Sequence, residues 1–128
     1  MRARIARRRR AETDRIIVDT ARELGIASLL DARPGTLSSG ERQRAGILQV
    51  IVHRPSLVVA DEPTGALHPG AADTVMTLFS RLVGDIGSAL VISTHDRALA
   101  SRHGFEIVGA STCTEAGSYL TTFTRHLD

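Results

Sequence analysis

The strongest constraint on the fold is an apolar run that ends in two adjacent carboxylates. Leu57-Val58-Val59-Ala60 leads directly into Asp61 and Glu62. A short run rich in leucine and valine is typical of a buried parallel strand. Ligands of open α/β sheets bind at the carboxyl ends of the strands, so these two carboxylates are candidate functional residues. The chain is therefore expected to form an α/β fold.

A second signal precedes this strand. Ser38 and Glu41 have the S-x-x-E spacing of a capping box, which predicts that a helix begins at Ser38. The Ser-Ser-Gly turn at 38–40 leaves backbone N–H groups without partners at the positive end of this helix. Such a terminus can hold an anion such as phosphate.

Four segments together resemble the ATP-binding cassette (ABC) ATPases of transporters. They are the signature loop Leu37–Glu41, the Walker B strand Leu57–Glu62, the D-loop Ala66-Leu67-His68 and the switch-histidine loop Ser93-Thr94-His95-Asp96. Each segment alone is common, but four in this order and at these intervals make a specific match over roughly residues 11–109. The sequence Ala-Asp-Glu-Pro-Thr-Gly at residues 60–65 is most similar to that of cassettes of the lipoprotein-release and macrolide-export type.

The resemblance implies a site for ATP and Mg²⁺. Asp61 would support Mg²⁺ through a water, because Mg²⁺ keeps several waters and takes few carboxylates. Glu62 would act as the base or orient the attacking water, and His95 would donate to the γ-phosphate. In isolation, adjacent carboxylates after a strand are usually turn or capping residues, and a lone histidine is usually a loop residue.

The resemblance also implies an assembly of several chains. The signature loop would contact the γ-phosphate of the nucleotide on a second ABC ATPase subunit through Ser38, Ser39, Gly40 and Glu41. The D-loop would contact that subunit through Ala66, Leu67 and His68. The other implied partner is a transmembrane permease, and no nucleic acid is expected. The implied location is cytoplasmic, peripheral at the inner face of the plasma membrane through the permease.

The sequence lacks two parts of such a site. All 16 basic residues are arginine, whereas the phosphate loop G-x-x-x-x-G-K-[ST] needs a lysine for the terminal phosphates. The only glutamines, Gln43 and Gln49, lie in the helix that follows the signature loop, so the family's glutamine loop is missing too.

We expect a fragment that carries the C-terminal half of a nucleotide site. The alternative is a catalytically inactive half-cassette that acts as a docking or regulatory module. Half of a chromosome-maintenance ATPase is disfavoured, because no heptad coil precedes the signature loop.

The expected fold is a partial P-loop NTPase (ABC ATPase) fold, a helical subdomain followed by parallel strands with covering helices. Residues 1–10 are a basic N-terminal arm, read as the solvated end of the first helix, as read-through, or as a contact for anionic lipid or nucleic acid. Residues 11–128 form the partial ABC ATPase domain. It comprises a helical subdomain (11–54), a core from Walker B to the switch histidine (55–109) and a C-terminal extension (110–128).

Local patterns predict the individual elements. Helices are expected at Ala11–Leu24, Ser39–Val52 and Gly70–Val83, with Gly25 ending the first and Pro69 beginning the third. A stripe of apolar residues on the third helix should face the core: Ala72, Val75, Met76, Phe79, Leu82 and Val83. Asp96 should cap a short helix that runs through Arg102, and strands are expected at Ala89–Ser93 and Phe105–Val108. A strand and a short helix are expected beyond Gly109.

The resemblance places the strand that leads to the phosphate loop between the switch-histidine strand and the following one. Ala89–Ser93 and Phe105–Val108 would then flank an empty slot, or close up and pair directly. An open slot would make the chain aggregation-prone. Part of the covering layer would be lost over Val58, Val59, Ile92 and Ile107.

Two residues depart from the family pattern. Ser39 stands where the family usually has glycine, which adds a Cβ where backbone approaches phosphate. His68 stands where the D-loop usually has aspartate, which removes a carboxylate from the subunit contact. With the missing phosphate loop, these changes suggest relaxed functional constraint or a damaged gene product.

We predict that the isolated chain binds ATP poorly and does not turn it over, because no lysine or glycine loop cradles the phosphates. Titration with ATP and an assay of magnesium-dependent phosphate release check this. Micromolar ATP binding together with hydrolysis by the pure chain would contradict the prediction.

Overall fold

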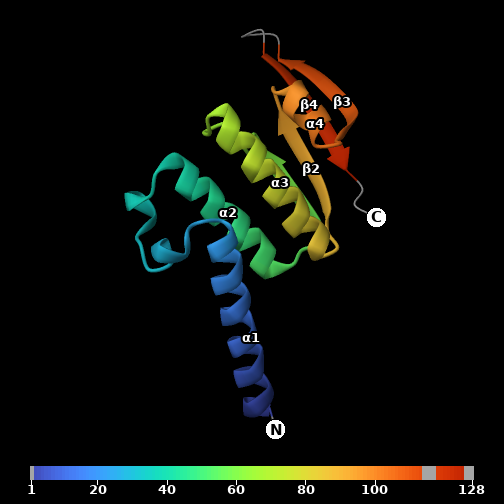
Figure 1. Cartoon of the computed structure of the whole chain (residues 1–128). Helices are drawn as coiled ribbons and strands as arrows, with labels where there is room; N and C mark the ends of the chain where they lie inside the picture. Colours follow the sequence, from blue (N-terminus) through green and yellow to red (C-terminus); the bar gives the residue numbers. More distant parts are fainter. Residues whose placement is uncertain (1, 114–117, 126–128) are drawn as a thin grey trace. The chain divides into compact units, whose positions relative to one another are not determined.

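The computed structural model describes the backbone of residues 2–113 and 118–125, and the side chains of residue 7 and residues 9–106. The chain divides into two compact units, Met1–His53 and Arg54–Asp128, which we describe separately (Figure 1). Within the described ranges, no helix is both long enough and apolar enough to cross a membrane.

The first unit is helical. It contains α1 (Arg2–Glu23), the 3-10 turns η1 (Ala27–Leu29) and η2 (Pro34–Thr36), and α2 (Ser39–His53). The end of α1 is as predicted: Gly25 has a φ of +70°, and the Ile26 N–H donates to the Ala21 carbonyl at 2.9 Å. This bond closes the last turn in the Schellman pattern, which requires a left-handed residue that glycine adopts at little cost.

The basic residues 2–10 continue α1 without a break. This agrees with the interpretation of the segment as the solvated end of the first helix. Arginine and alanine, which make up most of it, are good helix formers. Every described side chain from residue 7 to Arg15 is exposed, whereas Thr20, Ala21 and Leu24 are buried. Only the C-terminal end of α1 therefore contributes to the core of this unit.

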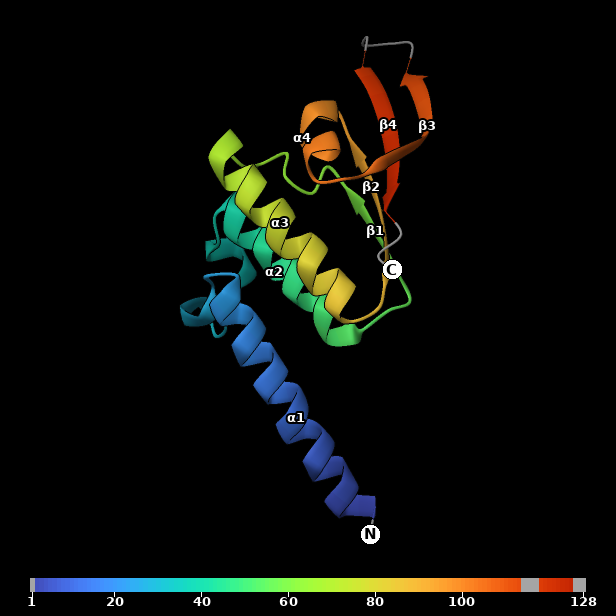
Figure 2. The same cartoon turned by 45° about the vertical axis from the view of Figure 1, so that its right-hand side comes forward.

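The described residues of the second unit form a four-stranded sheet and two helices. Its elements are β1 (Leu57–Asp61), α3 (Pro69–Asp85), β2 (Ala89–Thr94), α4 (Arg97–Arg102), β3 (Glu106–Cys113) and β4 (Ser118–Arg125). The strand order is β1-β2-β4-β3. β1 and β2 are parallel, while β4 is antiparallel to both of its neighbours. Figure 2 shows α3 running along one face of this sheet.

The predicted core face of α3 is confirmed. All residues of its apolar stripe are buried: Ala72, Val75, Met76, Phe79, Leu82 and Val83. Pro69 occupies the first turn, as expected, and the helix runs two residues past the predicted end, to Asp85. From β2, Leu90 and Ile92 are buried at 0% and 2% exposure. The core of this unit thus lies between α3 and the sheet.

The prediction of a buried strand at the Walker B segment is correct for only one face of β1. Val58 is 3% exposed, but Leu57 and Val59 are 53% and 72% exposed. Alternate side chains of a strand point to opposite faces, so a layer on one face buries only every second residue. Loss of cover was therefore expected correctly for Val59 and wrongly for Val58 and Ile92. The side chain of Ile107 lies outside the described residues.

The prediction about the slot beside β2 was also wrong. β4 lies between β2 and β3, so these two strands neither flank an empty slot nor pair with each other. Ile92 pairs with Phe123, and Phe123 pairs with Ile107. Threonine, tyrosine and phenylalanine favour strands, and pairing satisfies backbone groups that an open slot would leave without partners. No helix occurs in the described part of residues 110–125.

We predict that Val59→Lys reduces aggregation and changes the free energy of unfolding by less than about 0.5 kcal/mol, because a lysine on an exposed edge strand blocks strand-to-strand association. The matched change Val58→Lys should cost several kcal/mol, because it buries a charge without a partner. Urea denaturation and light scattering measure both effects. Equal destabilisation by the two variants would show that the second face of β1 is covered.

Candidate functional site

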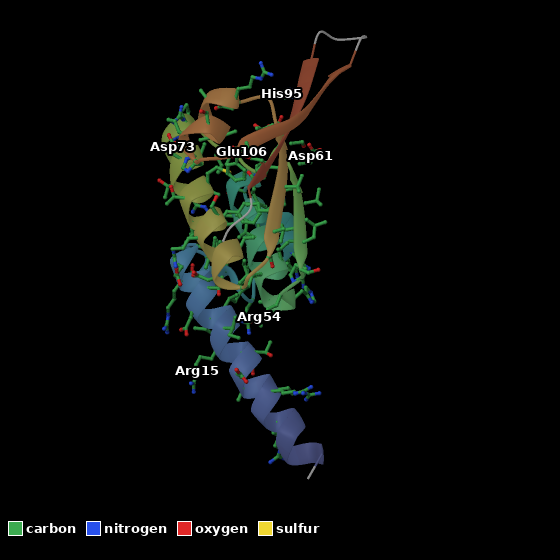
Figure 3. The ribbon with its side chains drawn as sticks, turned by 90° about the vertical axis from the view of Figure 1, so that its right-hand side faces the viewer. Arg15, Arg54, Asp61, Asp73, His95 and Glu106 are labelled. Atoms are coloured by element: carbon green, nitrogen blue, oxygen red, sulfur yellow. The ribbon has the colours of Figure 1, made fainter. Side chains whose placement is uncertain are left out.

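The candidate site lies where β1 and β2 end. The parallel pairing places Asp61 directly beside Ser93, so both strands stop at the same edge of the sheet. The Ser93 hydroxyl donates a hydrogen bond to the Asp61 Oδ1. Figure 3 shows Asp61 and His95 toward the same end of the sheet.

Glu62 is held by the loop that follows β2. Its N–H donates to the Ser93 carbonyl at 2.8 Å, which extends the strand pairing by one residue. Its Oε1 accepts the His95 backbone N–H at 2.8 Å and lies 3.3 Å from the His95 Nε2. Its Oε2 accepts the Thr94 hydroxyl at 3.4 Å. The structure thus brings together two residues that sequence motifs had placed in one site, although 33 positions separate them.

The loop that carries His95 is fixed at both ends. Thr94 is only 2% exposed, and its Oγ1 accepts the Asp96 N–H at 3.0 Å. Asp96 Oδ1 accepts the Leu99 N–H at 2.8 Å, which confirms the predicted cap of α4. The sequence places Ser93 and Thr94 in the switch-histidine loop, but it did not predict their hydrogen bonds to Asp61 and Glu62. The signal was present, because polar residues that end one strand of a parallel pair lie beside those that end the other.

A further polar cluster ties α4 to α3. Asp73 Oδ1 lies 3.0 Å from the His103 Nε2 and 3.2 Å from an Arg102 guanidinium nitrogen. The hydrogen bond from His103, followed by that from Arg102, holds the pKa of the Asp73 carboxyl below its usual value. The ionised Asp73 carboxylate therefore stabilises the fold above the ordinary carboxyl pKa, and this stabilisation is lost as the pH falls through the lowered pKa. No local sequence pattern indicates this contact, since α3 and α4 are distant in sequence.

The carboxylate oxygens at the end of β1 suit a Mg²⁺ ion that takes only one or two ligands from the protein. They do not suit a metal ion whose ligands all come from protein side chains. Within the described residues, no group of three or more His, Cys, Asp or Glu side chains could hold a metal. Asp61 is exposed and has one oxygen engaged by Ser93. One or two carboxylates beside a phosphate ligand is the usual Mg²⁺ arrangement. The residues present fit an ion shared with a nucleotide.

In the first unit, the predicted capping box at the start of α2 is confirmed. The Glu41 N–H donates to the Ser38 Oγ at 3.2 Å, and the Ser38 N–H donates to the Glu41 Oε2 at 2.8 Å. The hydroxyl of Ser39 accepts from Arg42 at 3.2 Å. Among the described residues, no acceptor is seen for the N–H groups of Ser39 and Gly40, as is usual in a first helical turn.

The D-loop residues follow the turn after β1. The Leu67 N–H donates to the Thr64 carbonyl at 3.1 Å, and Ala66 and His68 are exposed. His68 is the N-cap of α3, since its Nδ1 accepts the Ala71 N–H at 3.3 Å. The residue that departs from the family pattern therefore still caps the helix.

The first unit also has an apolar pocket of about 190 Å³. It is lined by Ile26, Leu29, Leu30, Ala32, Pro34, Leu37, Glu41, Ala45 and Leu48. Eight of these nine residues are apolar, and Leu30 is 40% exposed. An accessible apolar hollow of this kind is suited to a hydrophobic side chain of a partner.

Comparison with known proteins gives the family. The chain is similar to lipoprotein-releasing system ATP-binding proteins LolD, with 45% identity in Novosphingobium aromaticivorans over 72% of this chain and 43% of that protein. The relative in Psychrobacter arcticus is 44% identical over 71% of this chain and 40% of its own length. The expected similarity to lipoprotein-release cassettes is thus confirmed, although the chain spans less than half the length of these relatives. The family described as ABC transporter matches residues 2–65, which include the signature loop and the Walker B strand, and the chain therefore belongs to the ABC transporter ATPases.

Proposed function

We propose that this chain supplies the signature loop, the Walker B carboxylates and the switch histidine of an ATP-hydrolysing subunit of an ABC transporter. The observation that carries the proposal is the joint placement of Asp61, Glu62 and His95 at one edge of the sheet. This edge is where open α/β folds bind ligands.

In this proposal Glu62 orients the attacking water and accepts its proton. Its Oε1 is already held by the backbone N–H of His95, so the carboxylate has a fixed direction. The His95 side chain, 53% exposed, can turn toward a γ-phosphate and donate to it. Asp61 would hold Mg²⁺ through a water, and the ion would neutralise charge that develops on the phosphates.

The backbone at Glu62 supports a functional role. Glu62 has a φ of +45°, in the left-handed region that a residue with a long side chain seldom adopts. Such conformations are destabilising and occur often at active sites. The turn from Glu62 to Gly65, closed by a 3.0 Å bond between the Gly65 N–H and the Glu62 carbonyl, imposes this conformation. The strained backbone at Glu62 thus coincides with the position of a carboxylate in the proposed site.

The partners belong to the same proposal. The N–H groups at the start of α2 would contact the nucleotide of a second subunit, as the positive end of a helix favours an anion. The apolar pocket of the first unit would receive a hydrophobic side chain of the permease, and this contact would bring the chain to the inner face of the membrane. The names of the relatives favour lipoproteins as the cargo of such a system.

A phosphate loop has to come from elsewhere, because the 128 residues contain no lysine. The chain would act as the back part of a cassette, joined to or assembled with a part that carries the loop. If no such part restores ATP binding, the alternative is a catalytically inactive docking or regulatory module.

Strain at Glu62 can be tested without any activity. We predict that Glu62→Gly is more stable than Glu62→Ala by about 1 kcal/mol, because glycine adopts a positive φ freely and alanine does not. Both variants lose the same contacts to His95 and Thr94, so their difference isolates the backbone term. Denaturant titration of the two variants gives the difference, and equal midpoints would argue against strain at this position.

Activity requires the missing part. We predict that a chimera that joins the phosphate-loop part of a LolD relative to this chain hydrolyses ATP. In it, Glu62→Gln should lower hydrolysis by about 10²–10⁴-fold and leave ATP binding unchanged, because an amide keeps the shape but does not accept a proton.

The matched control for this experiment is Glu106→Gln, which removes an exposed carboxylate from β3 in the same unit. It should leave hydrolysis unchanged. Near-normal turnover of the Glu62→Gln chimera would contradict the role of Glu62. Failure of the unmodified chimera to bind ATP would favour the docking module.

A further inference from the structure

The described side chains in the first half of α1 are exposed to solvent. The described side chains of residue 7 and residues 9–15 are all exposed. Burial starts at Ile16 and Ile17, which are half-buried, and is complete at Ala21. Packing within the described protein therefore does not explain the composition of this half of the helix.

This half of α1 is strongly basic. The basic segment, residues 2–15, carries seven arginines and two acidic residues. Within the described side chains, no carboxylate forms an ion pair with Arg7, Arg9, Arg10 or Arg15, whereas Arg22 at the packed end of α1 lies 3.7 Å from Asp19. The charges of these four described arginines are thus available to an external partner.

Helical spacing gathers part of this charge. Arg7 and Arg10 are three positions apart and are therefore neighbours on the helix surface, whereas Arg15, eight positions after Arg7, lies about 80° to the other side of Arg7. Figure 3 shows Arg15 directed away from the helix axis. Guanidinium groups bind phosphate oxygens in pairs, which suits a surface covered with phosphate groups.

We infer that the basic segment is a docking surface for a membrane that exposes anionic phospholipid headgroups. It uses residues distinct from those proposed to handle ATP, and it does not depend on the phosphate loop. Binding is electrostatic, since the basic segment has only one large apolar residue, Ile5, besides its alanines. Each arginine near an anionic surface strengthens binding by about fivefold.

A membrane fits better than a nucleic acid. Residues 1–53 contain no Phe, Tyr or Trp, and therefore offer no ring on which exposed bases could stack. The ABC transporter family also works beside a bilayer, which places lipid headgroups within reach.

Vesicle sedimentation with the full chain tests the inference. The chain should bind vesicles of mixed phosphatidylcholine and phosphatidylglycerol, and should not bind phosphatidylcholine alone. Binding should disappear in about 1 M salt, where the Debye length is about 3 Å. Equal binding to both kinds of vesicle, or binding that survives high salt, would overturn the inference.

A charge-matched pair of variants locates the surface. The triple change Arg7→Gln, Arg10→Gln and Arg15→Gln should weaken binding to anionic vesicles by at least about tenfold. Glutamine is nearly as good a helix former as arginine, so α1 persists, which circular dichroism verifies. The control triple Arg33→Gln, Arg54→Gln and Arg97→Gln removes the same charge from exposed positions outside α1 and should have little effect.

Three outcomes of this comparison count against a membrane surface on α1. They are equal weakening by both triples, full binding by the α1 triple, and tighter binding to a single-stranded RNA than to anionic vesicles at the same salt. The last would identify the basic segment as a nucleic-acid contact.

Discussion

The parallel pairing of β1 with β2 is the interaction on which the candidate site depends. It sets Asp61 beside Ser93, and the next residue, Glu62, continues the pairing through its N–H. A slip of one residue would turn every side chain of β1 to the other face. Val58 would then leave the core and the exposed Val59 would enter it. Hydrophobic burial therefore fixes the register, and the register fixes which carboxylate meets His95.

The position of the switch-histidine loop also depends on α3. α3 supplies the cover that buries Leu90 and Ile92 of β2, so the helix and the strand are positioned together. Asp73 of α3 in turn holds Arg102 and His103 at the end of α4. Because the cap of α4 is Asp96, the residue after His95, the histidine is anchored through β2 on one side and through α4 on the other. Loosening of the core would therefore displace the site residues.

The features that could be predicted from the sequence are those decided by neighbours in the chain. The capping box and the stop at Gly25 each involve residues within five positions, so local chemistry specifies them. The grouping of Glu62 with His95, which are 33 positions apart, came instead from the resemblance to the ABC ATPases. The exposure of Leu57 and the place of β4 could not be predicted in this way. They depend on which strand and which layer lie alongside, which is set by pairing between distant segments. The hydrogen bond from Ser93 to Asp61 was not predicted for the same reason, since it depends on which strand lies beside β2.

The two departures from the family pattern have different consequences for folding and for binding. His68 caps α3 through its ring nitrogen, and the hydroxyl of Ser39 accepts from Arg42, so each is accommodated in the local structure. Neither therefore signals a damaged fold. In the proposed function, Ser39 would affect only the approach of a phosphate to the first turn of α2, where a Cβ takes up space that glycine leaves open. His68 would affect only the proposed contact with a second subunit. If functional constraint on this chain has relaxed, the change lies at surfaces that meet a ligand or a partner, and the packing that holds Glu62 against His95 is intact.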